Sequence, residues 1–132
     1  MILVDTSVLI NYFKGKENEQ VNKLDKIIEH GIPFGINYLI YTEVLQGAKS
    51  KKEYEKLDKY LSTQIFYHLK SVPESYRESA RLYIDCRKKG ITIRSTIDVL
   101  IAWTAIENGL YLLHDDEDYS KIATVEKSLL EY

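Results

Sequence analysis

Acidic side chains recur in this chain beside short apolar segments. The acids concerned are Asp5, Glu43, Asp98 and the run Asp115 to Asp118. An unpaired carboxylate buried among apolar residues is costly in free energy, so an acid in such a place needs a partner. Carboxylates that approach within a few ångströms also repel one another, unless some are protonated or a cation lies between them. The acids therefore indicate a cation site, provided that the fold brings them together.

The donor atoms indicate which cation such a site binds. No His or Cys accompanies Asp5, Glu43 or Asp98, and Cys86 is the single cysteine, which excludes a cysteine-rich zinc site. Carboxylate oxygens alone suit Mg²⁺ or Mn²⁺. A site of this type holds phosphate oxygens, activates a water as the nucleophile and stabilises the leaving oxygen. The predicted cofactor is therefore Mg²⁺ or Mn²⁺, and the predicted chemistry acts on phosphate groups.

Short apolar runs that alternate with helical patterns must position these acids. Strands are predicted at residues 2–4, 32–36, 64–69, 110–113 and 127–132. Helices are predicted near residues 6–14, 21–30, 38–46, 54–61, 73–89, 97–108 and 119–124. Asn37 is expected to cap the third helix, and Ser95 or Thr96 the sixth. The alternation predicts an α/β fold with a central parallel sheet of four to five short strands between layers of helices.

The predicted strand ends explain why the acids should meet. In such sheets, ligands bind beyond the carboxyl ends of the strands. Asp5 directly follows the first strand, and the run 115–118 follows the fourth after His114. Glu43 lies on the helix that the second strand feeds. Asp98 lies in the first turn of its helix, where free N–H groups and the helix dipole favour a carboxylate. We therefore expect these acids at one edge of the sheet.

Each acid also has a purely structural alternative. Asp98 can be an ordinary acid of a helix start, and Asp5 can be a helix N-cap. Within the acidic run, a solvated loop or a capping position is the favoured interpretation for Asp115 and Glu117. Only one or two acids of the run need face the predicted site.

Length and charge limit the class of protein. A chain of 132 residues suits a single domain over residues 1–132. The net charge of −2 gives no overall basic surplus, so contact with nucleic acid must depend on local patches or bound cations. No apolar run approaches the roughly 20 residues that span a bilayer, and the N-terminus lacks a basic leader. We therefore expect a cytoplasmic protein without a membrane partner.

Four blocks of sequence together resemble the PIN-domain ribonucleases, and more narrowly the VapC toxins of type II toxin–antitoxin pairs. The blocks are "MILVDTSVLINYFKG", "YLIYTEVLQGA", "IRSTIDVLIAWTAIENGLYLL" and "HDDEDYSKIA". Their order and spacing cover nearly the whole chain. The resemblance implies a PIN-like three-layer α/β/α fold.

The resemblance also implies a set of site residues. Four acids match the catalytic and metal-binding positions of the family: Asp5, Glu43, Asp98 and Asp116. Asp5 and Asp98 are expected to bind the metal most directly, while Glu43 and Asp116 complete the site. Supporting roles are implied for Thr6, Asn11 and Asp118.

Two residues of the last block depart from the family pattern. His114 stands where a hydroxyl residue is usual, and Tyr119 replaces the common Phe. His114 can tune the site or contact RNA, but a packing or capping role is favoured, because a single His without a visible partner is weak evidence for catalysis. Arg94 lies close to Asp98 in sequence and can pair either with an acid or with a phosphate of RNA.

The function implied by the resemblance is metal-dependent hydrolysis of phosphodiester bonds in RNA. It further implies a homodimer and a cognate antitoxin protein as partners. Two alternatives stay open: a catalytically inactive PIN-like binding module, and another Mg²⁺-dependent phosphoryl-transfer protein. A haloacid-dehalogenase-type phosphatase needs a second Asp two residues after the first, and Ser7 stands there. A receiver-type switch needs an Asp after the third strand, where "QIFYHLKS" offers none.

Overall fold

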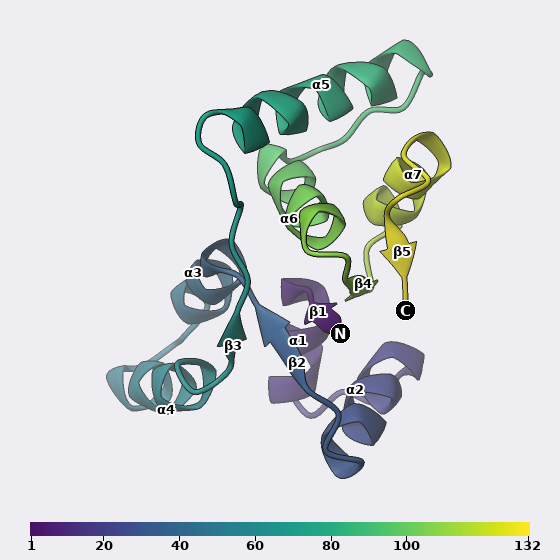
Figure 1. The fold of residues 1–132 in the computed structure, drawn as a ribbon. Helices are drawn as coiled ribbons and strands as arrows, with labels where there is room; N and C mark the ends of the chain where they lie inside the picture. The colour runs from purple at the N-terminus through teal and green to yellow at the C-terminus, as the bar shows by residue number, and fades with distance from the viewer.

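Five short parallel strands form the centre of the structure, which is a computed structural model describing residues 1–132 (Figure 1). The strands are β1 (Ile2–Val4), β2 (Phe34–Ile36), β3 (Ile65–Phe66), β4 (Tyr111–Leu113) and β5 (Leu130–Glu131). They follow one another across the sheet in the order β3-β2-β1-β4-β5, and every neighbouring pair is parallel. The predicted α/β fold with a central parallel sheet is confirmed.

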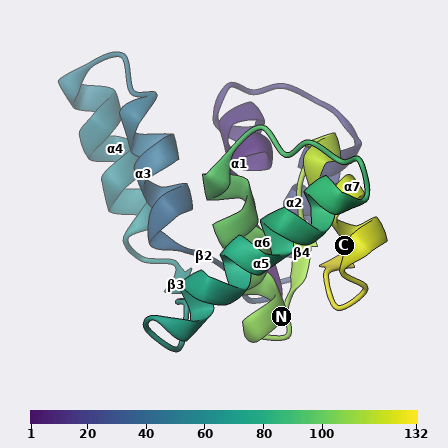
Figure 2. The ribbon, with the colours of Figure 1, turned by 90° about the horizontal axis from the view of Figure 1, so that it is seen from above.

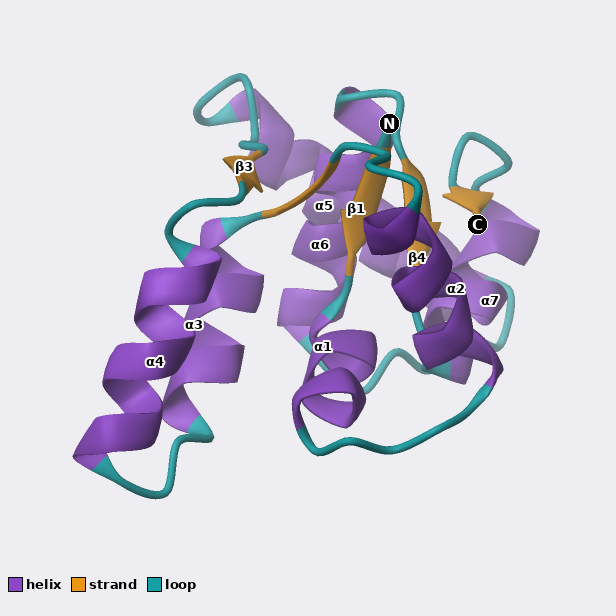
Figure 3. Cartoon of the chain, turned by 90° about the horizontal axis from the view of Figure 1, so that it is seen from below, coloured by secondary structure: helices purple, strands orange, loops and turns teal.

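Seven helices surround this sheet. They are α1 (Thr6–Phe13), α2 (Glu19–Glu29), α3 (Tyr38–Gln46), α4 (Lys51–Leu61), α5 (Glu74–Lys88), α6 (Thr96–Glu107) and α7 (Glu117–Val125). In Figure 1, α5, α6 and α7 lie on one side of the strands and α1 and α2 on the other. The paired helices α3 and α4 project beside β2 and β3, as the view from below shows (Figure 3). None of the helices combines the length and apolar character that crossing a membrane requires.

The centre of the sheet determines where the first and last site segments emerge. All three residues of β1 are buried, as expected for a strand covered by helices on both faces. Val4 of β1 pairs in register with Leu113 of β4. The next backbone N–H, that of Asp5, still donates to the Leu113 carbonyl at 2.9 Å. Asp5 and the segment after β4 therefore leave the sheet side by side, at its carboxyl edge.

Side-chain caps determine where several helices begin. Asn37 caps α3 and Ser95 caps α6, each by accepting a backbone N–H of its helix. The sequence predicts the cap at Asn37, and the structure selects Ser95 from the predicted alternatives Ser95 and Thr96. Asp116 caps α7, so this helix begins at Glu117, earlier than the predicted start near residue 119.

Both edge strands are shorter than predicted. β3 contains only Ile65 and Phe66 of the predicted 64–69, and β5 only Leu130 and Glu131 of 127–132. Each pairs on one side only, so few backbone hydrogen bonds maintain the extended chain. The apolar alternation that predicts longer strands indicates only which face of the chain each side chain lies on. Strand length also requires a neighbouring strand to pair with, and the alternation says nothing about that.

Candidate active site

Asp5 begins the site at the carboxyl end of β1. Its side chain is 4% exposed, and its Oδ2 accepts two hydrogen bonds from Ser7, from the backbone N–H at 3.0 Å and from Oγ at 2.6 Å. The other oxygen, Oδ1, accepts the Tyr119 hydroxyl at 2.8 Å. Asp5 is thus both the N-cap of α1 and an acid that faces the neighbouring helices. The capping and site interpretations of this residue are compatible.

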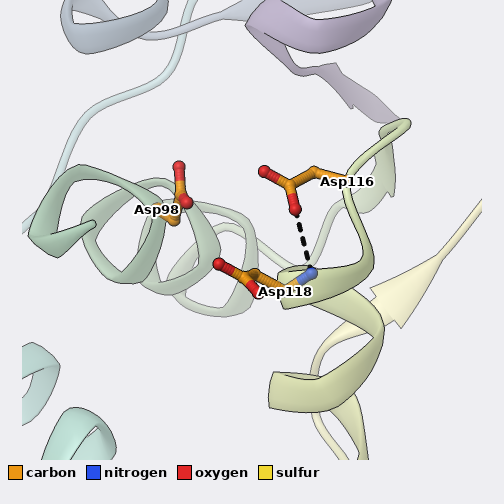
Figure 4. Close-up of side chains that lie close together, drawn as sticks. All are labelled: Asp98, Asp116 and Asp118. Carbon is orange, nitrogen blue, oxygen red and sulfur yellow. Dashed lines mark hydrogen bonds between the residues drawn. The ribbon is translucent and has the colours of Figure 1, made fainter. Parts of the chain in front are cut away.

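Three further acids gather where α6 and α7 begin (Figure 4). Asp98 lies in the first turn of α6, Asp116 caps α7, and Asp118 lies in the first turn of α7. One carboxylate oxygen from each lies within 4.8 Å of the others. Asp98 and Asp116 are half-buried and Asp118 is buried, so their charges are only partly screened by water. The structure thus brings Asp118, predicted only as a supporting residue, into close contact with two predicted catalytic acids.

Arg94, on the segment before α6, pairs with two of these acids. Its Nε donates to Asp118 Oδ2 at 3.0 Å, and its Nη2 donates to Asp116 Oδ1 at 3.1 Å. The Arg94 side chain is 67% exposed, whereas that of Asp118 is 2% exposed. Of the two partners that the sequence left open for Arg94, this structure shows the acids. The guanidinium compensates the charge of Asp118 and leaves that of Asp98 without a cationic partner.

Glu43 reaches the site from α3 through a contact with α1. Its Oε1 accepts the hydroxyl of the buried Thr6 at 2.6 Å, which links two residues 37 positions apart. Asn11 is half-buried on α1, and its side chain makes no hydrogen bond. The supporting role predicted for Thr6 therefore has a visible contact, whereas that of Asn11 stays a prediction.

The electrostatics of the site are most evident at Asp98. Burial and the nearby charges of Asp116, Asp5, Glu43 and Asp118 raise its pKa from the ordinary 3.8 to about 7. Near neutral pH, Asp98 without a cation therefore retains its proton far more readily than an ordinary Asp does. All four other acids act on this one carboxyl, which shows that they share one electrostatic environment.

The donor set fits a hard divalent cation. Carboxylate oxygens converge from four parts of the chain, with hydroxyl groups beside them, and no His or Cys side chain lies among the acids. Oxygen ligands of this kind select Mg²⁺ or Mn²⁺. A cation would also remove the repulsion that raises the Asp98 pKa. The residues available to hold it are Asp98 and Asp116 in the close cluster, with Asp5 and Glu43 adjoining.

His114 lies beside the site but its ring is directed to the C-terminal strand. Nε2 hydrogen-bonds Glu131 of β5 at 2.8 Å, and Nδ1 accepts the Asp116 backbone N–H at 3.2 Å. The ring also packs against that of Tyr119, with 5.0 Å between centroids. These are the contacts of a packed side chain, the role favoured from the sequence. An RNA contact by His114 stays a prediction.

Two residues of the site were not identified from the sequence as participants. Ser7 holds Asp5 and also accepts the Asp115 backbone N–H at 2.9 Å, so it joins the two segments that leave the sheet. Tyr119 touches Asp5 and Asp98 through its hydroxyl. The sequence contains a signal for each residue: a Ser two residues after the first acid, and a Tyr in place of the common Phe.

Asp115 and Glu117 are both exposed, which agrees with the favoured interpretation of these two acids as residues of a solvated loop or capping position.

A family model supplies the decisive comparison. The model that describes the PIN domain matches residues 2–125. The chain belongs to the PIN-domain family. Each predicted catalytic acid lies within the matched PIN domain.

Curated relatives of this PIN domain have been named as ribonucleases. VapC ribonuclease Mb1587 of Mycobacterium bovis and ribonuclease VapC11 of Mycobacterium tuberculosis are each 28% identical to this chain over 126 residues. The match covers 95% of this chain and 93% of each relative. The similarity thus extends across nearly all of both proteins.

Solved structures share the PIN fold. VapBC2 from Rickettsia felis, bound to a DNA fragment from its promoter, has a TM-score of 0.76 at 20% identity, covering 100% of this chain and 98% of that one. FitAcB from Neisseria gonorrhoeae has a TM-score of 0.71 at 19% identity, covering 100% and 97%. At these identities the likeness shows the three-layer fold alone, so the chemistry must be inferred from the site residues.

Proposed function

We propose that this PIN-domain protein is a metal-dependent endoribonuclease and the toxin of a toxin–antitoxin pair. The observation that carries the proposal is the convergence of Asp5, Glu43, Asp98 and Asp116 at the carboxyl edge of the sheet, with the Asp98 pKa raised to about 7 by burial and by the other acids. Such a concentration of charge is unfavourable without a cation and becomes a binding site with one. The names of the curated relatives support RNA as the substrate.

Each acid has a defined part in the proposed mechanism. Asp5 and Asp98 would hold Mg²⁺ or Mn²⁺ most directly, with Glu43 and Asp116 completing the site directly or through water. When bound, the metal supplies Lewis-acid chemistry, lowering the pKa of a water and stabilising the leaving oxygen. Asp98 would release its proton to solvent on becoming a ligand, since only the carboxylate binds a cation well. Thr6 donates its hydroxyl to Glu43 and so orients that carboxylate.

Arg94 is proposed to contact RNA from this edge of the site. Its exposed guanidinium already presents donors beside Asp116. A phosphate group offers paired acceptor oxygens as a carboxylate does, so the guanidinium can exchange one partner for the other. This contact would place a positive charge for phosphate beside the acids of the site, in a chain whose net charge is −2.

Protein partners are proposed from the names of solved relatives, which are VapBC2, FitAcB and a toxin–antitoxin complex from Klebsiella pneumoniae. Two apolar surfaces of this chain are suitable for an antitoxin and a second copy. One is a groove of about 460 Å³ between α5 and α6, where Tyr76 and Ile84 are exposed. The other lies between α1 and α4 and includes Tyr12, Phe13 and Tyr60. The view from above shows α5 lying across α6 at the first surface (Figure 2).

We also propose that the protein acts in the cytoplasm, because its proposed substrate is RNA.

Cleavage of RNA tests the function. Purified protein free of antitoxin is incubated with an RNA pool and Mn²⁺, beside Asp5→Ala, Asp98→Asn and the exposed control Asp25→Asn. Wild type and Asp25→Asn are expected to cut, and the two site variants to lose activity by at least 100-fold. An inactive wild type would favour the binding-module alternative. Full activity in Asp5→Ala and Asp98→Asn would overturn the site assignment.

A further inference from the structure

Tyr119 places a polar group in the most deeply buried part of the site. Its side chain is 0% exposed and is among the largest fully buried side chains of the chain. It lies in the first turn of α7, where the ring packs against that of His114. A buried hydroxyl is retained at little cost only if it is hydrogen-bonded, so its partners indicate its role.

Both hydrogen-bond partners of this hydroxyl are acids of the proposed metal site. The oxygen lies 2.8 Å from Asp5 Oδ1 and 3.4 Å from Asp98 Oδ1. The single hydroxyl proton serves one acceptor well, and the shorter distance assigns it to Asp5. Tyr119 thereby connects α7 with the end of β1 and with the first turn of α6, elements that are otherwise distant in sequence.

The contacts of Asp5 show what this hydroxyl does to the carboxylate. Oδ2 is already held by the backbone N–H and the hydroxyl of Ser7. Oδ1 has Tyr119 as its one protein donor. A carboxylate oxygen accepts two bonds, so Tyr119 fixes the direction of Oδ1 and leaves it a free lone pair for a cation.

We propose that Tyr119 is a positioning residue whose hydroxyl holds the Asp5 carboxylate, beside Asp98, in the orientation of a metal ligand. This inference rests on the proposed metal-dependent function. Phe at this position would fill nearly the same volume, so packing alone does not require the hydroxyl. Without it, Asp5 Oδ1 would lack its protein donor, and the Asp5 carboxylate would be free to turn about the oxygen that Ser7 holds. Loss of a hydrogen-bond partner that orients a ligand typically weakens metal binding by about 10- to 100-fold.

Mn²⁺ binding by the Tyr119→Phe variant tests the proposal. The matched control is Tyr111→Phe, the same chemical change on β4 at an exposed residue whose hydroxyl makes no hydrogen bond. Mn²⁺ affinity is measured by paramagnetic resonance titration of the antitoxin-free protein, and melting temperature is measured on the same samples. We expect about tenfold weaker binding in Tyr119→Phe, unchanged binding in Tyr111→Phe, and a folded protein in both.

A second readout separates positioning from structure. In Tyr119→Phe, the Mn²⁺ concentration that gives half-maximal RNA cleavage should rise about tenfold, while cleavage at saturating Mn²⁺ stays within a few-fold of wild type. Equal Mn²⁺ affinity in wild type and Tyr119→Phe would overturn the role of Tyr119 and leave the proposed function standing. Absence of Mn²⁺ binding by the wild type would overturn the metal site itself, and this inference with it.

Discussion

Replacing Asp98 with Asn should stabilise the metal-free protein while it abolishes catalysis. Burial and the neighbouring acids raise the Asp98 pKa from 3.8 to about 7, so ionising this group in the folded state is unfavourable. A difference of about three pKa units corresponds to about 4 kcal/mol. Because Asp98 is only half-buried, solvent screening reduces the expected effect to about 2 kcal/mol. Asn keeps the shape of the protonated side chain and never acquires the charge.

The effect should depend on pH in a defined direction. Folded protein retains the Asp98 proton between pH 3.8 and about 7, whereas unfolded protein loses it. Wild-type stability therefore falls as pH rises through this range, and Asp98→Asn does not share that loss. Urea denaturation in EDTA should give Asp98→Asn an advantage of about 2 kcal/mol at pH 8 and only a few tenths at pH 4.

The control for this experiment is Asp115→Asn, which removes an exposed charge from the same segment. It should change stability by less than about 0.5 kcal/mol at either pH. Wild type and Asp98→Asn of equal stability at pH 8 would refute the argument that the acids crowd one another. An advantage of the same size at pH 4 and pH 8 would also refute it, because repulsion requires the ionised group.

Three further predictions concern Arg94, the metal affinity of the site and the packing of β2. Arg94→Gln should lower the melting temperature of the metal-free protein, because it leaves the buried Asp118 without its main counter-charge. Calorimetry should show a larger decrease in low salt than in high salt, and a decrease that does not depend on salt would contradict this explanation. Mn²⁺ at about 100 times its dissociation constant should stabilise the wild type by about 2.7 kcal/mol, and the same Mn²⁺ concentration should stabilise Asp98→Asn by much less. Thermal unfolding measures both effects, and an equal increase in stability in the two proteins would exclude Asp98 as a ligand. Gly35→Ala should lower the free energy of unfolding in urea by about 1–3 kcal/mol, because a Cβ there would lie 2.6 Å from a backbone carbonyl oxygen of β3. The control Gly47→Ala should be nearly neutral, because its Cβ would meet nothing closer than 3.4 Å.

The sequence predicted the central architecture because the signals there are local and repeated. The apolar run Ile2 to Val4 marked a strand covered on both faces, and its burial confirms this. Asn37 has a cap signature that depends on only four residues, and the cap formed as predicted. The edge strands were overestimated because strand length depends on a pairing partner, which the local pattern does not contain.

The candidate site was predictable as a set of acids but not as a network. Strand ends and helix starts placed Asp5, Glu43 and Asp98 near one edge, and the family resemblance selected Asp116. The pairing of Arg94 with Asp118 and the Tyr119 hydroxyl on Asp5 depend on how α7 packs against α6 and β1. Contacts across 24 and 114 residues arise from tertiary packing, and no spacing rule in the chain encodes them.

Diffraction from crystals that contain Mn²⁺ would show directly whether one divalent cation site joins these acids. Crystals of the antitoxin-free protein would be soaked in Mn²⁺ and measured at a wavelength where manganese scatters anomalously. We expect an anomalous peak bounded by Asp5, Asp98 and Asp116, and its loss in crystals of Asp98→Asn. A peak held by other residues, or no peak in wild-type crystals saturated with Mn²⁺, would show that these acids do not form the proposed metal site.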